Sequence, residues 1–98
     1  MTNLEIIINE AVSHKIYTEE EIMEIMETTG DLKINTFATW KAKGYKVKKG
    51  EHARIVTKLW KHKTRKEVTE DDEEITFSNM YLVKAFLFTA DQVERMVA

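Results

Sequence analysis

The sequence contains no cysteine and no proline, and only three of its 98 residues are glycine. Without cysteine, the chain has no disulfide, thiolate metal site or cysteine nucleophile, which fits a reducing compartment. The longest uninterrupted apolar run is Ala85–Phe88, far short of the roughly 20 residues that cross a membrane. The opening Met-Thr-Asn-Leu-Glu lacks the basic region of a signal peptide. We therefore expect a cytoplasmic protein that makes no membrane contact.

Sequence motifs of catalysis and metal binding are also missing. The histidines, His14, His52 and His62, are scattered and lack the i, i+4 spacing of a helical metal pair. There is no glycine-rich phosphate loop, nucleophile elbow or zinc-protease motif. The acidic run Asp71–Glu74 lacks the glycine and the spaced ligands of a calcium loop. We predict that the protein is not an enzyme and uses no metal or other cofactor.

The charges are sorted along the sequence, although the net charge is only -2. Residues 33–66 contain twelve Lys or Arg side chains and one acid, a local charge of +11, between flanking segments of -7 and -6. A basic segment can follow a phosphate backbone even when the whole protein is weakly acidic. With 43% hydrophobic and 33% charged residues, the chain is also typical of a folded protein, and we predict one domain over residues 1–98.

Four aromatic residues, Phe37, Trp40, Tyr45 and Trp60, lie within the basic segment. Cations beside flat rings are the combination that binds single-stranded nucleic acid. The same pattern also fits a solvated face above ordinary core aromatics. Helical spacing favours the core for Phe37 and Trp40. For Trp60 the two interpretations are balanced, because strand alternation places it among basic side chains.

The N-terminal part of the chain has the 3.6-residue hydrophobic period of amphipathic helices. A first helix follows a cap at Thr2 or Asn3. The capping box of Thr18 and Glu21 begins a second helix, and a third, short helix spans residues 36–43.

After Gly44 the hydrophobic period changes from 3.6 to 2. Alternation predicts strands at 45–48 and 52–62, paired as a hairpin through a tight turn at 49–51. Near-continuous apolarity predicts a central strand at 79–88.

Two further segments complete the predicted fold. Residues 63–74 contain a single apolar side chain, Val68, and we expect a flexible charged loop there. Thr89 and Gln92 predict a capping box and a C-terminal helix from about residue 90. The fold class is α+β, with N-terminal helices packed on a small antiparallel sheet and a short C-terminal helix.

The segments Thr36–Trp40 and Gly44–Val56 resemble the N-terminal domain of the anti-restriction protein ArdC. That family's pattern has a short helix, a glycine, V-R/K-K-G-E-K/H and an I-V strand. A charged gap and an aromatic strand ending in F-N-x-x-Q follow, which here is Phe88-Thr-Ala-Asp-Gln92. The resemblance covers about 60 of the 98 residues. The sequence departs from the pattern at Thr89, where the family usually has Asn, and in its acidic first 30 residues.

The resemblance implies a single-stranded-DNA-binding module of plasmids, phages and related elements. We expect a stand-alone version of that domain, without the family's metalloprotease domain. By resemblance, lysines and Arg54 would contact the DNA backbone, and Trp40 or Trp60 would stack on bases. The candidate nucleic-acid-binding residues are Lys41, Lys43, Lys46, Lys48, Lys49, Arg54, Lys58, Trp60 and Lys61.

The leading functional hypothesis is therefore non-sequence-specific binding of single-stranded DNA, with RNA as a possible ligand. The alternative is a protein-binding module that inhibits a host defence nuclease. Such a module would use the acidic segment 67–74 or the Glu-rich second helix as a phosphate-like surface. Salt-sensitive binding to oligonucleotides would favour the first hypothesis, and stable co-purification with a nuclease would favour the second.

Overall fold

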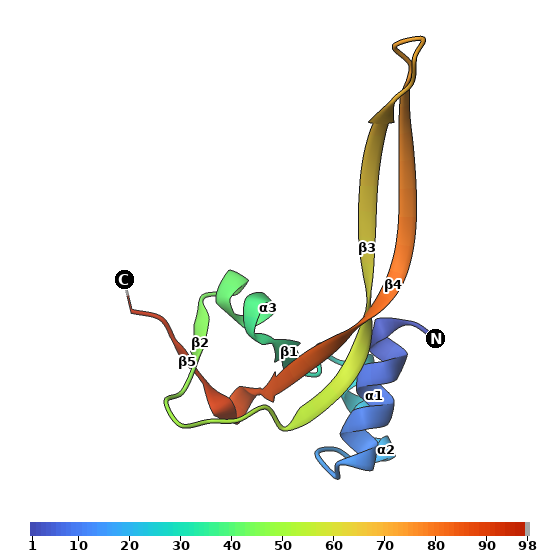
Figure 1. The fold of residues 1–98 in the computed structure, drawn as a ribbon. Helices are drawn as coiled ribbons and strands as arrows, with labels where there is room; N and C mark the ends of the chain where they lie inside the picture. The colour runs from blue at the N-terminus through green and yellow to red at the C-terminus, as the bar shows by residue number, and fades with distance from the viewer. Residues whose placement is uncertain (98) are drawn as a thin grey trace.

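The computed structural model describes residues 1–97 and has the predicted α+β class (Figure 1). N-terminal helices pack on antiparallel sheets, and one very long hairpin projects from the rest of the fold. In chain order the elements are α1 (Asn3–Ser13), α2 (Glu19–Glu27), β1 (Ile34–Thr36), α3 (Phe37–Ala42), β2 (Tyr45–Val47), β3 (Ile55–Val68), β4 (Glu74–Thr89), the 3-10 turn η1 (Ala90–Gln92) and β5 (Val93–Arg95).

The three predicted helices are present, and two of them begin with reciprocal capping boxes. Thr2 and Glu5 close the first turn of α1, and Thr18 and Glu21 close that of α2. Each box satisfies backbone N–H groups that the first turn of a helix leaves without partners. None of the helices in residues 1–97 is long and apolar enough to cross a membrane.

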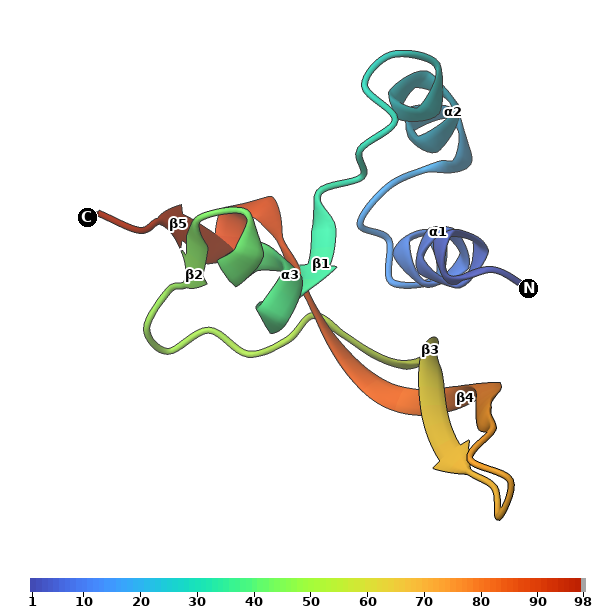
Figure 2. The same cartoon turned by 90° about the horizontal axis from the view of Figure 1, so that it is seen from above.

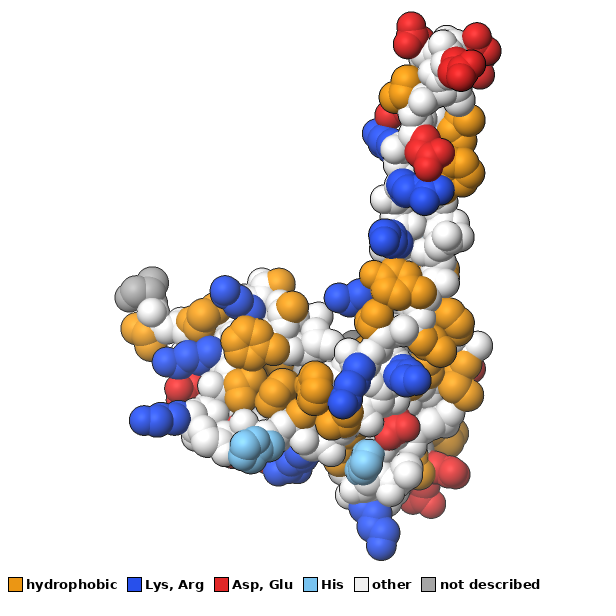
Figure 3. Space-filling model, in the orientation of Figure 1, with side chains coloured by type: hydrophobic (Ala, Val, Ile, Leu, Met, Phe, Trp, Pro, Cys, Tyr) orange, Lys and Arg blue, Asp and Glu red, His pale blue; other side chains and the backbone are white. Residues whose placement is uncertain are grey.

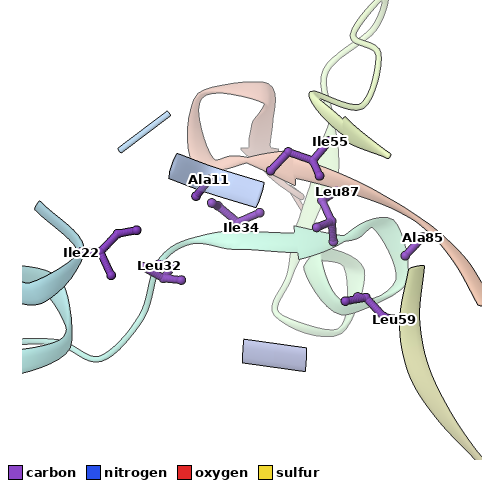
Figure 4. Close-up of a cluster of buried hydrophobic side chains, with 8 residues drawn as sticks. All are labelled: Ala11, Ile22, Leu32, Ile34, Ile55, Leu59, Ala85 and Leu87. Carbon is purple, nitrogen blue, oxygen red and sulfur yellow. The ribbon is translucent and has the colours of Figure 1, made fainter. Parts of the chain in front are cut away.

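The main sheet has the strand order β1-β4-β3, so β4 is central where all three strands meet. β3 and β4 are antiparallel with Ile55 opposite Leu87, and β1 pairs with the last three residues of β4. Helix α1 packs against β3 on one face of this sheet, and α2 adds Ile22 to the core between the helices and the sheet (Figure 4). The buried hydrophobic cluster consists of Ala11, Ile22, Leu32, Ile34, Ile55, Leu59, Ala85 and Leu87.

The predicted hairpin between residues 45–48 and 52–62 is wrong. β2 pairs instead with β5, in a separate two-stranded antiparallel sheet with Val47 opposite Val93. The predicted turn does form, since Glu51 donates its N–H to the Lys48 carbonyl at 3.2 Å and Gly50 has φ 86°. The turn leads the chain from one sheet to the other, so the pairing partner of β2 comes from the far end of the sequence.

The predicted C-terminal helix is present only as a single 3-10 turn, and a strand follows it. Thr89 donates its N–H to Gln92 Oε1 at 3.1 Å, as in a capping box, but only the single turn η1 follows. Gln92 is buried, and its Nε2 donates to the His52 carbonyl at 2.6 Å. Val93 then pairs with β2, and Met96 donates its N–H to the Gly44 carbonyl at 2.9 Å. Strand pairing thus satisfies backbone groups that a helix would otherwise have satisfied internally.

The predicted charged loop at 63–74 is mostly strand. β3 continues to Val68, β4 begins at Glu74, and only residues 69–73 form the turn between them. Backbone pairing across the two strands holds these residues in an extended conformation, although almost all their side chains are exposed. We call residues 61–82 the arm; it projects away from the helices (Figure 1). Flexibility of this segment stays a prediction.

Candidate nucleic-acid interface

The even-numbered residues at the base of the hairpin form an exposed face opposite the core. Because successive side chains of a strand point to opposite faces, the buried Ile55, Leu59 and Leu87 place the even-numbered positions on the outer side. Three cross-strand pairs follow one another there. We call this surface the lysine face; its pairs are Val56–Phe86, Lys58–Lys84 and Trp60–Leu82.

Two lysines oppose each other directly at the centre of the lysine face. Like charges at opposed positions of an antiparallel pair destabilise the sheet. Within the described residues 1–97, neither Lys58 nor Lys84 forms an ion pair that would offset this repulsion. Lys84 Nζ lies 5.5 Å from the ring centroid of Phe86, a cation–π arrangement. An anion placed between the two ammonium groups would relieve the repulsion.

The apolar residues that flank these lysines are open to solvent. Val56 and Phe86 are each 49% exposed and Leu82 is 47% exposed. Neither α1 nor α2 covers this side of the hairpin base, since α1 packs on the opposite face and α2 lies beyond α1 (Figure 2). Exposed rings beside lysines offer flat apolar surface and positive charge together.

An open groove adjoins this face, between the start of α3 and the base of the arm (Figure 3). Its volume is about 560 Å³. Lys84, Phe86 and Trp60 of the lysine face line it together with Lys61 and Phe37. The groove is therefore bordered by three rings and two cations.

The two tryptophans have different environments. Trp40 is buried and donates its indole N–H to the Phe88 carbonyl at 2.9 Å, as expected of a core residue. Trp60 is half-buried, and its indole N–H donates to the Met1 carbonyl at 3.0 Å. Phe37 is 53% exposed, so the core interpretation of that residue is wrong. It lies on the solvent side of the first turn of α3, where it borders the groove.

The nine candidate residues from the sequence separate into two groups. Lys58, Trp60 and Lys61 lie on β3 at the base of the arm. The others lie toward the end of the molecule that contains β2 and β5, away from the arm in both ribbon views (Figures 1 and 2). That second group consists of Lys41, Lys43, Lys46, Lys48, Lys49 and Arg54.

Several members of the second group have acidic or carbonyl partners. Lys43 pairs with Asp31 at 3.9 Å, and Lys46 pairs with Glu94, its cross-strand neighbour, at 3.5 Å. Arg54 Nη2 lies 2.5 Å from an Asp91 carboxylate oxygen. These contacts lower the positive potential of the group relative to the lysine face.

Asp91 also receives a hydrogen bond from the Thr89 hydroxyl. That bond is the main cause that lowers the pKa of Asp91 below its usual value. Burial opposes it, and the attraction of the Arg54 and Lys48 charges lowers the pKa further. Lys48 Nζ donates to the Asp91 backbone carbonyl at 3.1 Å. Asp91 thus holds the segment before β3 and the turn after β2 against η1.

Sequence reasoning missed the β4 side of the interface, Leu82, Lys84 and Phe86. Lys84 was recognisable as unusual, because it is the only charged residue between Glu74 and Asp91. Its position opposite Lys58 follows only from the register of the hairpin, which the sequence did not predict. In the described residues, His, Cys, Asp and Glu side chains do not gather in any group of three that could hold a metal ion.

A family model described as the N-terminal domain of anti-restriction factor ArdC matches residues 10–86. The match includes α2, α3, β3 and most of β4, and therefore both halves of the lysine face. No curated protein and no solved structure matches the chain.

Proposed function

Because the chain belongs to the family of the N-terminal domain of anti-restriction factor ArdC, we propose that its lysine face binds single-stranded DNA without sequence specificity. Membership of this family implies an anti-restriction-related, single-stranded-DNA-binding domain, which is the non-catalytic part of ArdC. One observation supports this location. Lys58 and Lys84 face each other across the hairpin between exposed apolar neighbours, and neither forms an ion pair with an acid within residues 1–97.

In the proposed mechanism, the two facing lysines bind one or two phosphates of the strand. Each lysine that neutralises a phosphate releases condensed counterions, which provides affinity independent of sequence. The rings of Phe86 and Phe37 and the exposed part of Trp60 stack on bases along the groove. Lys61 continues the positive charge along the groove.

The composition of the lysine face supports binding without base readout. Its six residues include no Arg, Asn or Gln, whose planar groups read base edges through paired hydrogen bonds. Its two lysines are point charges suited to phosphates. Stacking on an aromatic ring tolerates any base, because every base has a π-face. The family favours DNA as the ligand; the chemistry of the face also accommodates RNA.

In this proposal, the second group of basic residues provides a further path for the phosphate backbone of the DNA. Its ion pairs are exposed, and such pairs are worth little and exchange readily for phosphates. Lys41 and Lys49 form no ion pair within residues 1–97. A strand that leaves the groove past α3 would meet this group next.

The proposal includes the biological setting. The protein is a non-enzymatic, anti-restriction-like accessory of a plasmid, phage or prophage, and residues 1–98 form a single domain.

One observation favours the alternative, a protein that inhibits a host nuclease. Five consecutive acids, Glu70–Glu74, lie at the exposed tip of the arm (Figure 3), where a nucleic-acid-binding protein would contact them in place of phosphates.

Fluorescence anisotropy with labelled single- and double-stranded oligonucleotides tests this function. We expect single strands to bind more tightly than duplexes of the same length, with affinity that falls as salt rises. No binding at low salt would refute the proposal. Co-purification of a nuclease that is lost when Glu70–Glu74 are replaced by Gln would then support the alternative.

A further inference from the structure

One edge of the arm lacks the features that normally keep an exposed strand from pairing with another chain. Proteins protect such edges with charged residues, proline or bulges. The nine residues of β4 from Ile75 to Val83 include no charged residue and no proline. β1 pairs only with residues 87–89 of β4, so nothing in residues 1–97 covers this edge. The outer edge of β3 is different, because Lys61, Lys63, Arg65 and Lys66 lie along it.

The backbone of β4 presents its hydrogen-bonding groups to this open edge. Trp60 exchanges backbone hydrogen bonds with the Asn3 side chain, at 2.7 and 3.0 Å, on the side away from β4. In an antiparallel pair, the opposed residue then also points its N–H and C=O outward. That residue is Leu82, and the alternation extends the pattern to Thr76, Ser78 and Met80. The edge is therefore a ready template for a further strand.

Large apolar side chains of β4 are also exposed on the arm, although the Arg65 guanidinium lies 5.1 Å from the ring centroid of Phe77. On the odd-numbered face, Ile75, Phe77 and Tyr81 are 40%, 42% and 41% exposed. Together they form an apolar row beside the open edge, and all three are residue types that are enriched in strands.

We propose that two copies of the chain pair through this edge, β4 against β4 and antiparallel, around a twofold axis at Asn79. In this register Phe77 lies opposite Tyr81 of the second copy, and Ile75 lies opposite Val83. Both are non-hydrogen-bonded pairs, in which side chains approach most closely. The result is a four-stranded arm with the order β3-β4-β4-β3.

Charge complementarity supports a second copy as the occupant. The same register places Glu74 opposite Lys84 of the other chain, at both ends of the paired segment. Glu74 already forms an exposed ion pair with Lys66 at 3.4 Å, which leaves part of its carboxylate for a second cation. Pairing through β3 would instead bring Lys61 and Arg65 of two copies together, which like-charge repulsion disfavours.

The twofold arrangement also limits growth. It buries both uncharged edges and leaves the two charged β3 edges outside, so assembly stops at the dimer. In this register even-numbered residues of one copy lie opposite even-numbered residues of the other, and opposed side chains share one face of a sheet. Both lysine faces therefore lie on the same side of the joined sheet. A single strand of DNA would then meet two faces in sequence, with phosphates replacing Glu74 at Lys84, since such an exposed ion pair is worth little. Dimer formation itself does not depend on DNA binding.

Analytical ultracentrifugation over a range of concentrations tests the pairing. One strand per copy is a narrow interface, so we expect a reversible shift from 11.5 kDa toward twice that mass. Met80→Pro removes an outward N–H and should abolish the shift, since edge strands tolerate proline at such positions. Thr64→Pro is the matched control on the β3 edge and should leave dimerisation intact. A parent protein that stays monomeric at every concentration overturns the proposal.

A cysteine substitution measures the register directly, because the natural chain has no cysteine. Asn79→Cys places two thiols opposite each other at a non-hydrogen-bonded pair, within the Cα spacing that a disulfide needs. We expect rapid oxidation to a covalent dimer, and slow oxidation for the control Thr64→Cys. Equal rates for the two variants would contradict the proposed edge.

Discussion

Asn3 acts as a substitute strand for the exposed edge of β3 at Trp60. Its Nδ2 donates to the Trp60 carbonyl at 3.0 Å, and its Oδ1 accepts the Trp60 N–H at 2.7 Å. The Met1 carbonyl accepts the indole N–H of the same residue. The N-terminus thus fixes the position of a ring that borders the proposed DNA groove.

Asn3→Ala should destabilise the fold and loosen Trp60. It removes two hydrogen bonds that are each worth about 0.5–1.5 kcal/mol, and water replaces part of that loss because the site is exposed. Urea denaturation followed by tryptophan fluorescence measures both effects. Ser13→Ala, at the exposed end of the same helix, is the control. Equal stability of the two variants would show that Asn3 does not hold β3.

Asp91 should contribute to stability in a pH-dependent way. Its pKa is lowered in the folded state, so the contribution is present above the unfolded pKa and is lost as pH falls through the folded value. Asp91→Asn should therefore be less stable than the parent at neutral pH and should converge with it in acid. Thermal denaturation as a function of pH measures this, with Asp71→Asn in the turn of the arm as the control. A difference that does not change with pH would contradict this role.

Shortening the arm should leave the fold almost unchanged. Residues 61–82 contribute no buried side chain, and Lys63 lies opposite Asn79. Joining these two residues by an Asn-Gly turn keeps the pairing register, because this dipeptide suits a two-residue hairpin. We expect little change in Tm. A large decrease would show that the arm packs on the rest of the protein.

Lys58→Glu should separate stability from binding. Replacing one of two facing lysines by an acid turns a repulsive cross-strand pair into an attractive one, worth about 0.2–1 kcal/mol. We therefore expect a protein that is slightly more stable and binds single-stranded DNA less tightly. Lys61→Glu, which lies opposite Tyr81, is the stability control. Loss of stability in Lys58→Glu would mean that the two lysines do not repel each other.

The elements that the sequence predicted best depend on local interactions. Thr2 and Thr18 cap helices through bonds within three residues, and Gly50 permits its turn through its own φ. The elements that the sequence missed depend on distant partners. Val93 is in a strand because β2 lies beside it, and no property of residues 93–97 indicates that neighbour. The short β1 was missed because three residues are too few to display a period.

The arm shows a different limit of sequence reasoning. The composition of residues 63–74 predicts a loop because they have almost nothing to bury, and burial is what the hydrophobic period measures. Strand pairing satisfies the backbone without burying side chains, so Lys63 and Arg65 occupy a strand despite their exposure. The same register determines which residues oppose Lys58 and Trp60. The β4 half of the candidate site was therefore beyond the reach of the sequence alone.

The salt dependence of single-stranded DNA binding in two lysine variants tests the central claim most directly. Lys58→Ala/Lys84→Ala removes the facing pair, and Lys46→Ala/Lys48→Ala/Lys49→Ala removes the basic residues of β2 and its turn. If the lysine face is the primary site, the double variant should flatten the log–log salt slope by about 0.7 for each phosphate that is no longer neutralised, more than the triple variant does. An unchanged slope in the double variant, with a flattened slope in the triple variant, would contradict this account.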